Sequence, residues 1–404
     1  MSTETLKPTK FREGLLTLGV VLLIVGLIAA FIGTGGAFTS KDASRAYFFG
    51  WLFWACLTLG MTGLALLHHV VRAKWSSPLY RIWEAGGGYK MLVLMGLFFI
   101  PLAFIFGPNI WKWMDPAVVA KDPVVSGKMP YLSSWFFNFR WILYFAGLAA
   151  IMFKLQNMLR KEELGAGRKM NVARSWFAPP MLAVYVLFFN FAMTDWAMSL
   201  DIHWFSTIYG VWMMNGFGLA GLSFAMMILC TQAEKAPFKG IISPNLIRDQ
   251  GHMMLALTMV WAYFSLSQYL IIWSGNLPEF NVYYLARSIN GFGPLGMAMI
   301  LGCFAVPFLL LVGPFSPWLK TNPKTLGFIA GWIFLFRFVD FHYIISPSLH
   351  DKPFVVPPIA DVGMLAVFGG IWLVAFSFFS RELPLLTTAE PYRDQEPEAE
   401  HVGA

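Results

Sequence analysis

Long apolar stretches alternate with short polar segments along almost the whole chain. A helix needs about 20 apolar residues to cross the hydrocarbon of a bilayer, and ten stretches of the sequence meet this requirement. They are residues 14–33, 46–71, 89–107, 135–156, 174–198, 205–231, 251–273, 289–313, 325–346 and 358–379. The pattern predicts an all-α integral membrane protein with a polytopic transmembrane domain over residues 1–380. The first stretch is longer than the apolar core of a signal peptide, so we expect an uncleaved first helix.

The basic residues indicate how these helices cross the membrane. The N-terminus, every second loop and the C-terminal tail together hold 20 of the 29 Lys and Arg residues, and the opposite loops hold 7. Basic loops stay in the cytoplasm, so the distribution predicts that both termini are cytoplasmic. Residues 381–404 are rich in Glu and Pro, which predicts a disordered acidic tail.

A weak internal similarity divides the chain into halves. Gly88 and Gly251 each open an apolar stretch with a similar sequence, and Phe-rich runs end at Asp195 and at Asp340. Spans two to five and six to nine can therefore be two four-helix bundles in the same orientation, with the first and last helices flanking them. Chance similarity between apolar helices is the alternative.

Few ionisable residues lie in or beside the spans, and a charge in hydrocarbon is seldom retained without a role. Eight of them fall toward the outer side and form what we call the outer set: Arg140, Asp195, Asp201, His203, Arg337, Asp340, His342 and Asp361. We expect them to meet in one pocket, where carboxylates and imidazoles can take protons from a bound quinol or pass them to water. The inner set is His68, His69, Asp249 and His252, and Glu84 lies in the loop that follows the second span.

Each candidate also has a structural explanation. Arg337 and Asp340 are three residues apart and can neutralise each other on one helix face, whereas His342 points elsewhere. Asp195 can be a helix-end carboxylate in water, and Asp361 can cap the tenth helix. For the inner histidines the alternative is an ordinary position at the membrane interface.

Composition excludes several other classes of protein. Only 13% of residues are charged, against about 25% in soluble domains. The net charge of +7 follows from the basic loops, so nucleic-acid binding is not expected. The three cysteines lie singly in apolar runs, which disfavours iron–sulfur clusters and c-type haem. A b-type haem needs two histidines at matched depth on facing helices. His69 and His252 share the inner side, whereas His342 has no partner at its own depth. We therefore expect no metal and no redox cofactor in this chain.

Three longer motifs resemble a known family. They are Asp195-Trp-Ala-Met-Ser-Leu-Asp-Ile-His-Trp-Phe, the run from Trp261 to Glu279, and Phe338-Val-Asp-Phe-His. Together they resemble the smaller polysulfide-reductase/NrfD-like membrane subunit of bacterial alternative complex III, a quinol:electron-acceptor oxidoreductase. The resemblance covers essentially the whole chain, including its ten helices.

The resemblance implies two four-helix bundles with flanking helices in the bacterial cytoplasmic membrane. It implies a larger homologous NrfD-like partner and neighbouring subunits that carry iron–sulfur clusters and c-type haems, with lipids and a terminal oxidase as further partners. The larger subunit is the better candidate for quinol oxidation, and the smaller one is associated with a proton path of two half-channels. The outer and inner sets fit these half-channels, and quinone or lipid is the ligand class to expect.

Two other functions remain open from the sequence. A proton-coupled secondary transporter would place its charged site at the midplane between broken helices, whereas the charges here are predicted nearer the outer face. A structural scaffold would use the same charges only to dock helices and partner subunits.

Overall fold

The computed structural model describes residues 9–37, 39–71, 74–235, 238–239, 242–289, 291–350 and 355–381. These residues form helices and connecting turns, with no strand among them. The predicted disordered tail lies, apart from Arg381, outside the described residues.

The helices are α1 (Thr9–Thr34), α2 (Lys41–Val71), α3 (Ser77–Gly87), α4 (Tyr89–Leu97), α5 (Gly107–Ile110), α6 (Pro116–Lys121), α7 (Pro123–Leu132), α8 (Ser134–Lys161), α9 (Gly167–Trp196), α10 (Tyr209–Gln232), α11 (Pro244–Gly275), α12 (Pro278–Ile289), α13 (Gly293–Ile300), α14 (Val306–Val312), α15 (Ser316–Thr321), α16 (Pro323–Leu349) and α17 (Ile359–Arg381). Three π-helical segments interrupt or extend them: Leu102–Phe106, Glu162–Ala166 and Leu301–Ala305. Short 3₁₀ turns are Lys74–Ser76, Lys112–Met114 and Met198–Leu200.

Ten helical spans in the described residues are long and apolar enough to cross a membrane. They are Phe11–Thr34, Lys41–Val71, Ser77–Ile110, Ser134–Leu164, Met170–Leu200, Tyr209–Gln232, Pro244–Gly275, Gly293–Val312, Pro323–Leu349 and Ile359–Arg381. Each overlaps one predicted span, so the prediction of an all-α integral membrane protein is confirmed. The clearest difference is in the third span, where the predicted loop before residue 89 is the helix α3.

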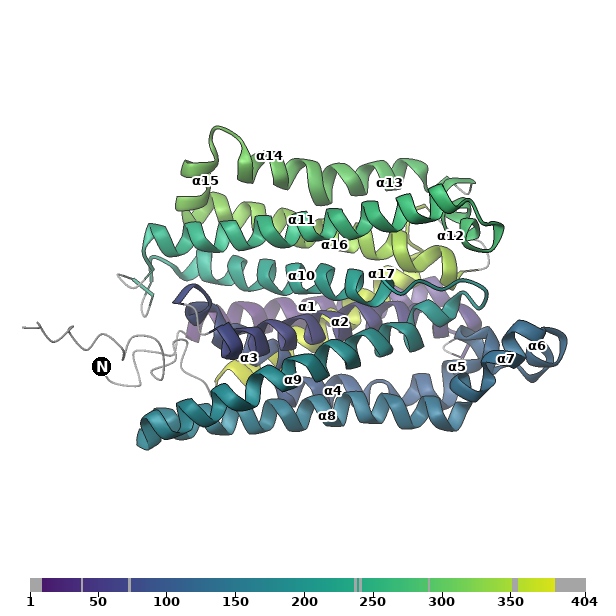
Figure 1. The fold of residues 1–404 in the computed structure, drawn as a ribbon, viewed down its shortest axis with the longest axis horizontal. Coiled ribbons are helices and arrows are strands. Elements are labelled where there is room, and N and C mark those ends of the chain that lie inside the picture. Colours follow the sequence, from purple (N-terminus) through teal and green to yellow (C-terminus); the bar gives the residue numbers. More distant parts are fainter. Residues whose placement is uncertain are drawn as a thin grey trace, which may run out of the picture.

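Helices α2 and α10 form the centre of the molecule. Helices α4 and α9 pack against α2 on one side, with α8 packed on both of them. On the other side α11 and α16 pack against α10, with α13 and α14 beyond them (Figure 1). In the most apolar 18-residue segment of α2, 89% of the residues are buried, whereas in the corresponding segment of α1 only 17% are buried. The same pairs of helices touch in each half, as α2 with α9 and α10 with α16, which supports two bundles related by a parallel repeat.

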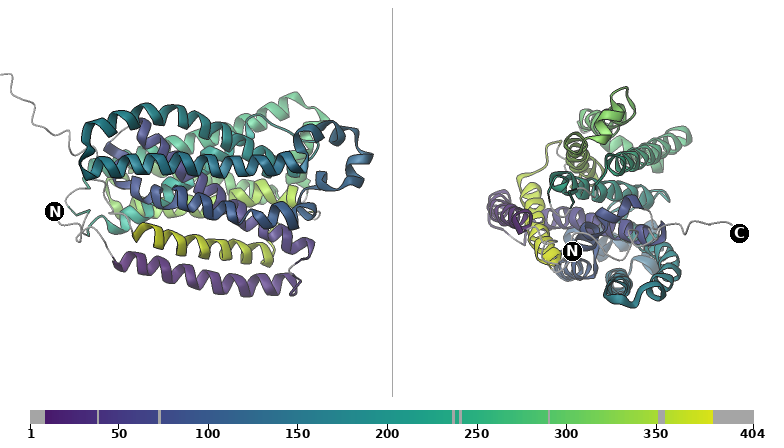
Figure 2. Two further views of the ribbon diagram at one scale, coloured as in Figure 1. Left: turned by 90° about the horizontal axis from the view of Figure 1, so that it is seen from below. Right: turned by 90° about the vertical axis from the view of Figure 1, so that its left-hand side faces the viewer.

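Helices α1 and α17 flank the bundles and run along each other (Figure 2). Gly19, Gly26 and Gly33 recur every seven residues on α1, and α17 presents Gly363 and Gly370 to them. A Cβ atom on Gly26 would lie 2.6 Å from the Val367 nitrogen and 2.7 Å from the Gly363 oxygen. Small residues let membrane helices approach closely, so these glycines set the distance between the two helices.

The two ends of the bundle differ. Helices α5, α6 and α7 project beyond the long helices at one end, which we call the lobe end (Figure 1). Asp115 and Asp122 cap α6 and α7 by accepting backbone N–H groups. At the opposite end, which we call the terminal end, α1 begins and α17 finishes. The outer set was predicted toward the lobe end and the inner set toward the terminal end.

Candidate functional site

Asp195 ends α9 in a buried hydrogen-bond cluster at the lobe end. Arg140 on α8 donates from Nε to Asp195 Oδ2 at 2.7 Å and from Nη2 to Oδ1 at 2.8 Å. The Tyr144 hydroxyl donates to Oδ2 at 2.9 Å, and Asp195 is only 1% exposed. The alternative of a carboxylate in water is therefore wrong. The charged pair is bidentate, a geometry in which Arg binds carboxylates strongly.

Aromatic rings hold the Arg140 guanidinium in place. Its central carbon lies 3.9 Å from the centre of the Tyr131 ring and 4.4 Å from that of Phe136. Arg140 also donates to the Tyr131 carbonyl oxygen at 2.6 Å. The ion pair thus joins α8 and α9 to the C-terminal end of α7, and connects the bundle with the lobe.

Arg337 and Asp340 form a salt bridge on one face of α16, as their spacing predicts. The Arg337 guanidinium also lies 5.4 Å from the centre of the Trp261 ring and faces Gly216 on α10. Both charged residues are 3% exposed, and Asp340 Oδ1 has no hydrogen-bond partner among the described residues. Arg337 is the fifteenth of the 27 residues of α16. It therefore lies near the middle of the helix.

His342 and Asp361 have different neighbours from this pair. The His342 ring packs 6.0 Å from Phe49 and 5.8 Å from Phe292, measured between ring centres. Asp361 Oδ2 lies 2.8 Å from Nε2 of His350, a buried histidine that the sequence analysis did not select. The Asp361 carboxylate therefore joins the start of α17 to the end of α16, and its role is not only that of a helix cap.

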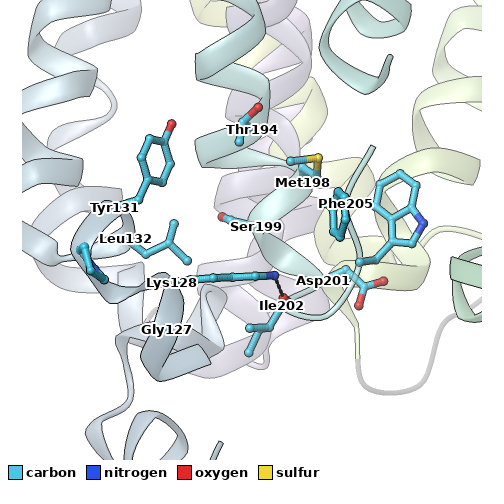
Figure 3. Close-up of a pocket in the computed structure, with 12 residues that line it drawn as sticks. Gly127, Lys128, Tyr131, Leu132, Thr194, Met198, Ser199, Asp201, Ile202 and Phe205 are labelled. Carbon is cyan, nitrogen blue, oxygen red and sulfur yellow. Dashed lines mark hydrogen bonds between the residues drawn. The ribbon is translucent and has the colours of Figure 1, made fainter. Parts of the chain in front are cut away.

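Asp201 and His203 lie in the loop that follows α9. His203 Nε2 is 2.9 Å from Oδ2 of Asp122, the residue that caps α7, and 56% of the His203 side chain is exposed. Asp201 instead lines a cavity of about 340 Å³ between α7 and this loop (Figure 3). The cavity walls also include Gly127, Lys128, Tyr131, Leu132, Thr194, Met198, Ser199, Trp204 and Phe205.

Two ionisable groups of the lobe have shifted pKa values at this cavity. Burial lowers the pKa of the Lys128 ammonium, against the opposing effect of the carboxylates of Asp122 and Asp201. Burial and the nearby Asp195 carboxylate raise the pKa of the Tyr131 phenol, against the positive charge of Arg140. The cavity therefore adjoins the Asp195 cluster through Tyr131.

The outer set does not form the single pocket that was predicted. In the described part of the chain its members fall into separate interactions: Arg140 with Asp195 in the first bundle, Arg337 with Asp340 in the second, Asp361 with His350, and His203 with Asp122. Helical period and depth predicted which residues are buried. They do not fix the rotation of each helix, which decides the partners.

The histidines of α2 belong to a buried polar network at the terminal end. Arg174 donates from Nη1 to His69 Nδ1 at 2.6 Å and from Nη2 to Glu162 Oε2 at 3.1 Å. Arg has no acceptor, so His69 Nδ1 accepts and Nε2 carries the imidazole proton, 3.1 Å from the Tyr80 hydroxyl. His68 Nδ1 lies 2.6 Å from Ser76 Oγ. Both histidines are at most 2% exposed, so they lie inside the protein and not against lipid or water.

Acidic residues complete this network, which we call the terminal-end network. Arg81 on α3 forms salt bridges with Glu84 on the same helix and with Glu163 after α8. The second Glu84 oxygen, Oε1, is buried without a hydrogen-bond partner among the described residues. The network thus contains the two guanidinium groups of Arg81 and Arg174 against three carboxylates, the third being Glu162.

The sequence analysis missed most of this network because it assigned residues 72–88 and 157–173 to loops. In the structure α3 occupies the first of these segments, and α8, a π-helical segment and α9 run through the second. The spacing of Arg81 and Glu84, three residues apart, was the available signal.

Asp249 and His252 do not extend this network. Both are exposed at the start of α11, and His252 Nδ1 lies 3.4 Å from the Lys320 amine. Burial and the charge of Arg248 lower the pKa of Lys320. The expected pairing of these residues with His68 and His69 in one path is therefore wrong.

Several side chains that could ligate a metal or a haem have other contacts in the described part of the chain. No group of three His, Cys, Asp or Glu side chains there could hold a metal ion. Cys56 and Cys303 are buried and Cys230 is half-buried, each as a free thiol. His69 is engaged by Arg174 and Tyr80, whereas His252 is exposed, so these two do not form a haem-ligand pair.

In the comparisons with known proteins, no family model matches the chain and the search of curated proteins gives no significant match.

Proposed function

We propose that this chain is a membrane subunit of a respiratory quinol:electron-acceptor oxidoreductase of the alternative complex III type. It holds no redox cofactor, lies beside a larger homologous subunit and the iron–sulfur and haem c subunits, and contributes proton transfer from the terminal end. It belongs to a bacterial cytoplasmic membrane with both termini inside. The motif resemblance and the ten-helix fold support the class, and the terminal-end network supports the role.

The charge balance of that network is the observation on which the proton role depends. Arg81 lies between the carboxylates of Glu84 and Glu163, while Arg174 already pairs with Glu162. Among the described groups of this network, three carboxylates meet two guanidinium groups in a mostly buried environment. Buried charge is expensive unless it is compensated, so a carboxylate in such a network is a suitable place for a proton to be taken up and passed on. Glu84 Oε1, which has no partner, is the oxygen placed to receive it.

At the lobe end, the Asp195–Arg140 cluster supplies a buried acidic group. Quinol oxidation releases protons, and a carboxylate with a hydroxyl partner such as Tyr144 can exchange them. The two clusters lie at opposite ends of α8 and α9, which matches the proposed two half-channels.

A proton-coupled secondary transporter is the second candidate. The specific observation in its favour is the buried Arg337–Asp340 pair within α16, with Arg337 near the middle of the helix, beside the interrupted helix α13–α14 and its π-helical segment Leu301–Ala305. A transporter would purify alone and retain transport, whereas the proposed subunit would purify with haem- and cluster-bearing partners.

The test uses the purified complex in proteoliposomes, with quinol oxidation and proton uptake measured together. Glu84→Gln is expected to lower proton uptake per quinol at least about tenfold, the size of effect typical of losing a positioned proton-transfer group. Asp249→Asn, at an exposed acid of the same end, is the matched control and should leave uptake unchanged. Equal uptake in the parent and Glu84→Gln complexes would refute the role of the network. Purification of this chain without any redox partner would refute the class.

A further inference from the structure

The cavity at the lobe end has features that the proposed proton transfer does not use. Its volume of about 340 Å³ is open on one side, and its walls come from α7, the end of α9 and the following loop. Figure 3 shows Lys128 lying across the cavity from α7 to the loop, where its amine donates to the Ile202 carbonyl oxygen. Tyr131 and Thr194 lie on the side nearer the helical bundle. The site therefore lies where the bundle meets the projecting lobe, beside the end of the candidate membrane span Met170–Leu200.

The walls are mainly apolar. Leu132 and Met198 face the cavity from opposite walls, and Phe205, 53% exposed, lies at its edge. Such a surface suits hydrocarbon, since burying apolar area is favourable in proportion to that area. The cavity thus fits a ligand with an acyl chain attached to a compact polar group.

The polar groups of the cavity carry both signs of charge. Lys128 supplies a half-buried ammonium, and Asp201 supplies a carboxylate. The Tyr131 hydroxyl is buried beside the Asp195 carboxylate, so it belongs to that cluster and not to the polar groups offered to a ligand. An ammonium has three donors, so Lys128 can keep the Ile202 contact and still bind an anionic oxygen.

These signs select among ligand classes. A simple anion is attracted by Lys128 but repelled by Asp201 and by the neighbouring Asp122. A simple cation is attracted by the carboxylates of Asp201 and Asp122 but repelled by the ammonium of Lys128. A headgroup with a phosphate and an ammonium a few bonds apart satisfies both charges at once, which is the electrostatic complementarity that gives specificity.

We propose that this cavity binds a zwitterionic aminophospholipid, with its phosphate on Lys128, its ammonium on Asp201 and an acyl chain along Leu132, Met198 and Phe205. The site goes beyond the proposed proton role, because its ligand does not react. It would fix the lobe against α9 by joining α7 to the loop through the lipid.

The test is native mass spectrometry of the delipidated full chain titrated with phosphatidylethanolamine or phosphatidylglycerol in detergent. The parent chain is expected to prefer phosphatidylethanolamine about tenfold, the effect of one charge-assisted contact. Lys128→Met should weaken both lipids about tenfold, whereas Asp201→Asn should abolish the preference between them. Lys128→Arg, which keeps the cation, should retain binding. Lys121→Met, at an exposed lysine of the same lobe, is the matched control.

Two outcomes would overturn the proposal. The first is equal lipid affinity in the parent, Lys128→Met and Asp201→Asn chains. The second is displacement of bound lipid by a short-chain quinol at equal concentration, which would assign the cavity to a quinol headgroup. Neither outcome bears on proton uptake through Glu84, so failure here is distinguishable from failure of the proposed function.

Discussion

At the scale of single residues, the buried ion pairs are the most consequential feature. Sequence reasoning selected Asp195, Arg140, Arg337 and Asp340 because charges within apolar spans are rare, and all four are buried. It paired Arg337 with Asp340 correctly because they share one helix face. It did not pair Arg140 with Asp195, since that contact depends on how α8 and α9 are rotated against each other.

The Asp195–Arg140 pair makes a direct stability prediction. Arg140→Met leaves the Asp195 carboxylate buried with only hydroxyl support, so we expect the free energy of unfolding to fall by about 3–5 kcal/mol. Thermal unfolding of the purified protein in detergent measures this change. Adding Asp195→Asn should recover part of the loss, because the charge without a partner is then removed.

Asp115→Asn is the control for that series. Asp115 caps α6 at the exposed lobe, and Asn caps helices about as well as Asp. Its melting temperature should equal that of the parent. An Arg140→Met protein as stable as the parent would show that the ion pair contributes little.

At the scale of helices, hydropathy located all ten spans but not the contacts between them. Hydrophobic periodicity and length can be read from the sequence of one helix, whereas close packing depends on the side chains of two helices. The seven-residue repeat of Gly19, Gly26 and Gly33 was visible in the sequence, but it identifies no partner. The structure identifies the partner as α17, whose glycines face this stripe.

Gly26→Leu tests this contact. The leucine side chain would meet the backbone of Val367 and Gly363, which cannot move without displacing α17. Overpacking of this kind typically costs about 1–3 kcal/mol, so we expect a lower melting temperature in detergent. Gly14→Leu on the same helix is the control, because a Cβ atom there meets nothing within 4 Å. Equal destabilisation by both variants would mean that α1 is sensitive to bulk anywhere along its length.

At the scale of the whole molecule, the distribution of basic residues predicts the orientation in the membrane. The lobe end is expected outside and the terminal end inside. Two exposed positions at opposite ends test this: Lys121 on the lobe and Glu234 after α10. In intact cells a membrane-impermeant maleimide should label Lys121→Cys, and it should label Glu234→Cys only after the membrane is opened.

The native cysteines provide a low background for this measurement, since two are buried and one is half-buried. The parent chain, treated in the same way, is the control. Labelling of Glu234→Cys in intact cells, with Lys121→Cys protected, would reverse the orientation and place the terminal-end network on the outer side.

The pairing of α1 with α17 also bears on how the protein is made. Helix α1 is synthesised before the other described helices and acquires its glycine-matched neighbour only after residues 359–381 have been made. Until then α1 remains in the bilayer with its small-residue stripe against lipid. Assembly of this flank therefore waits for α17, and a chain truncated before residue 359 would leave α1 without its partner and expose it to membrane quality-control proteases.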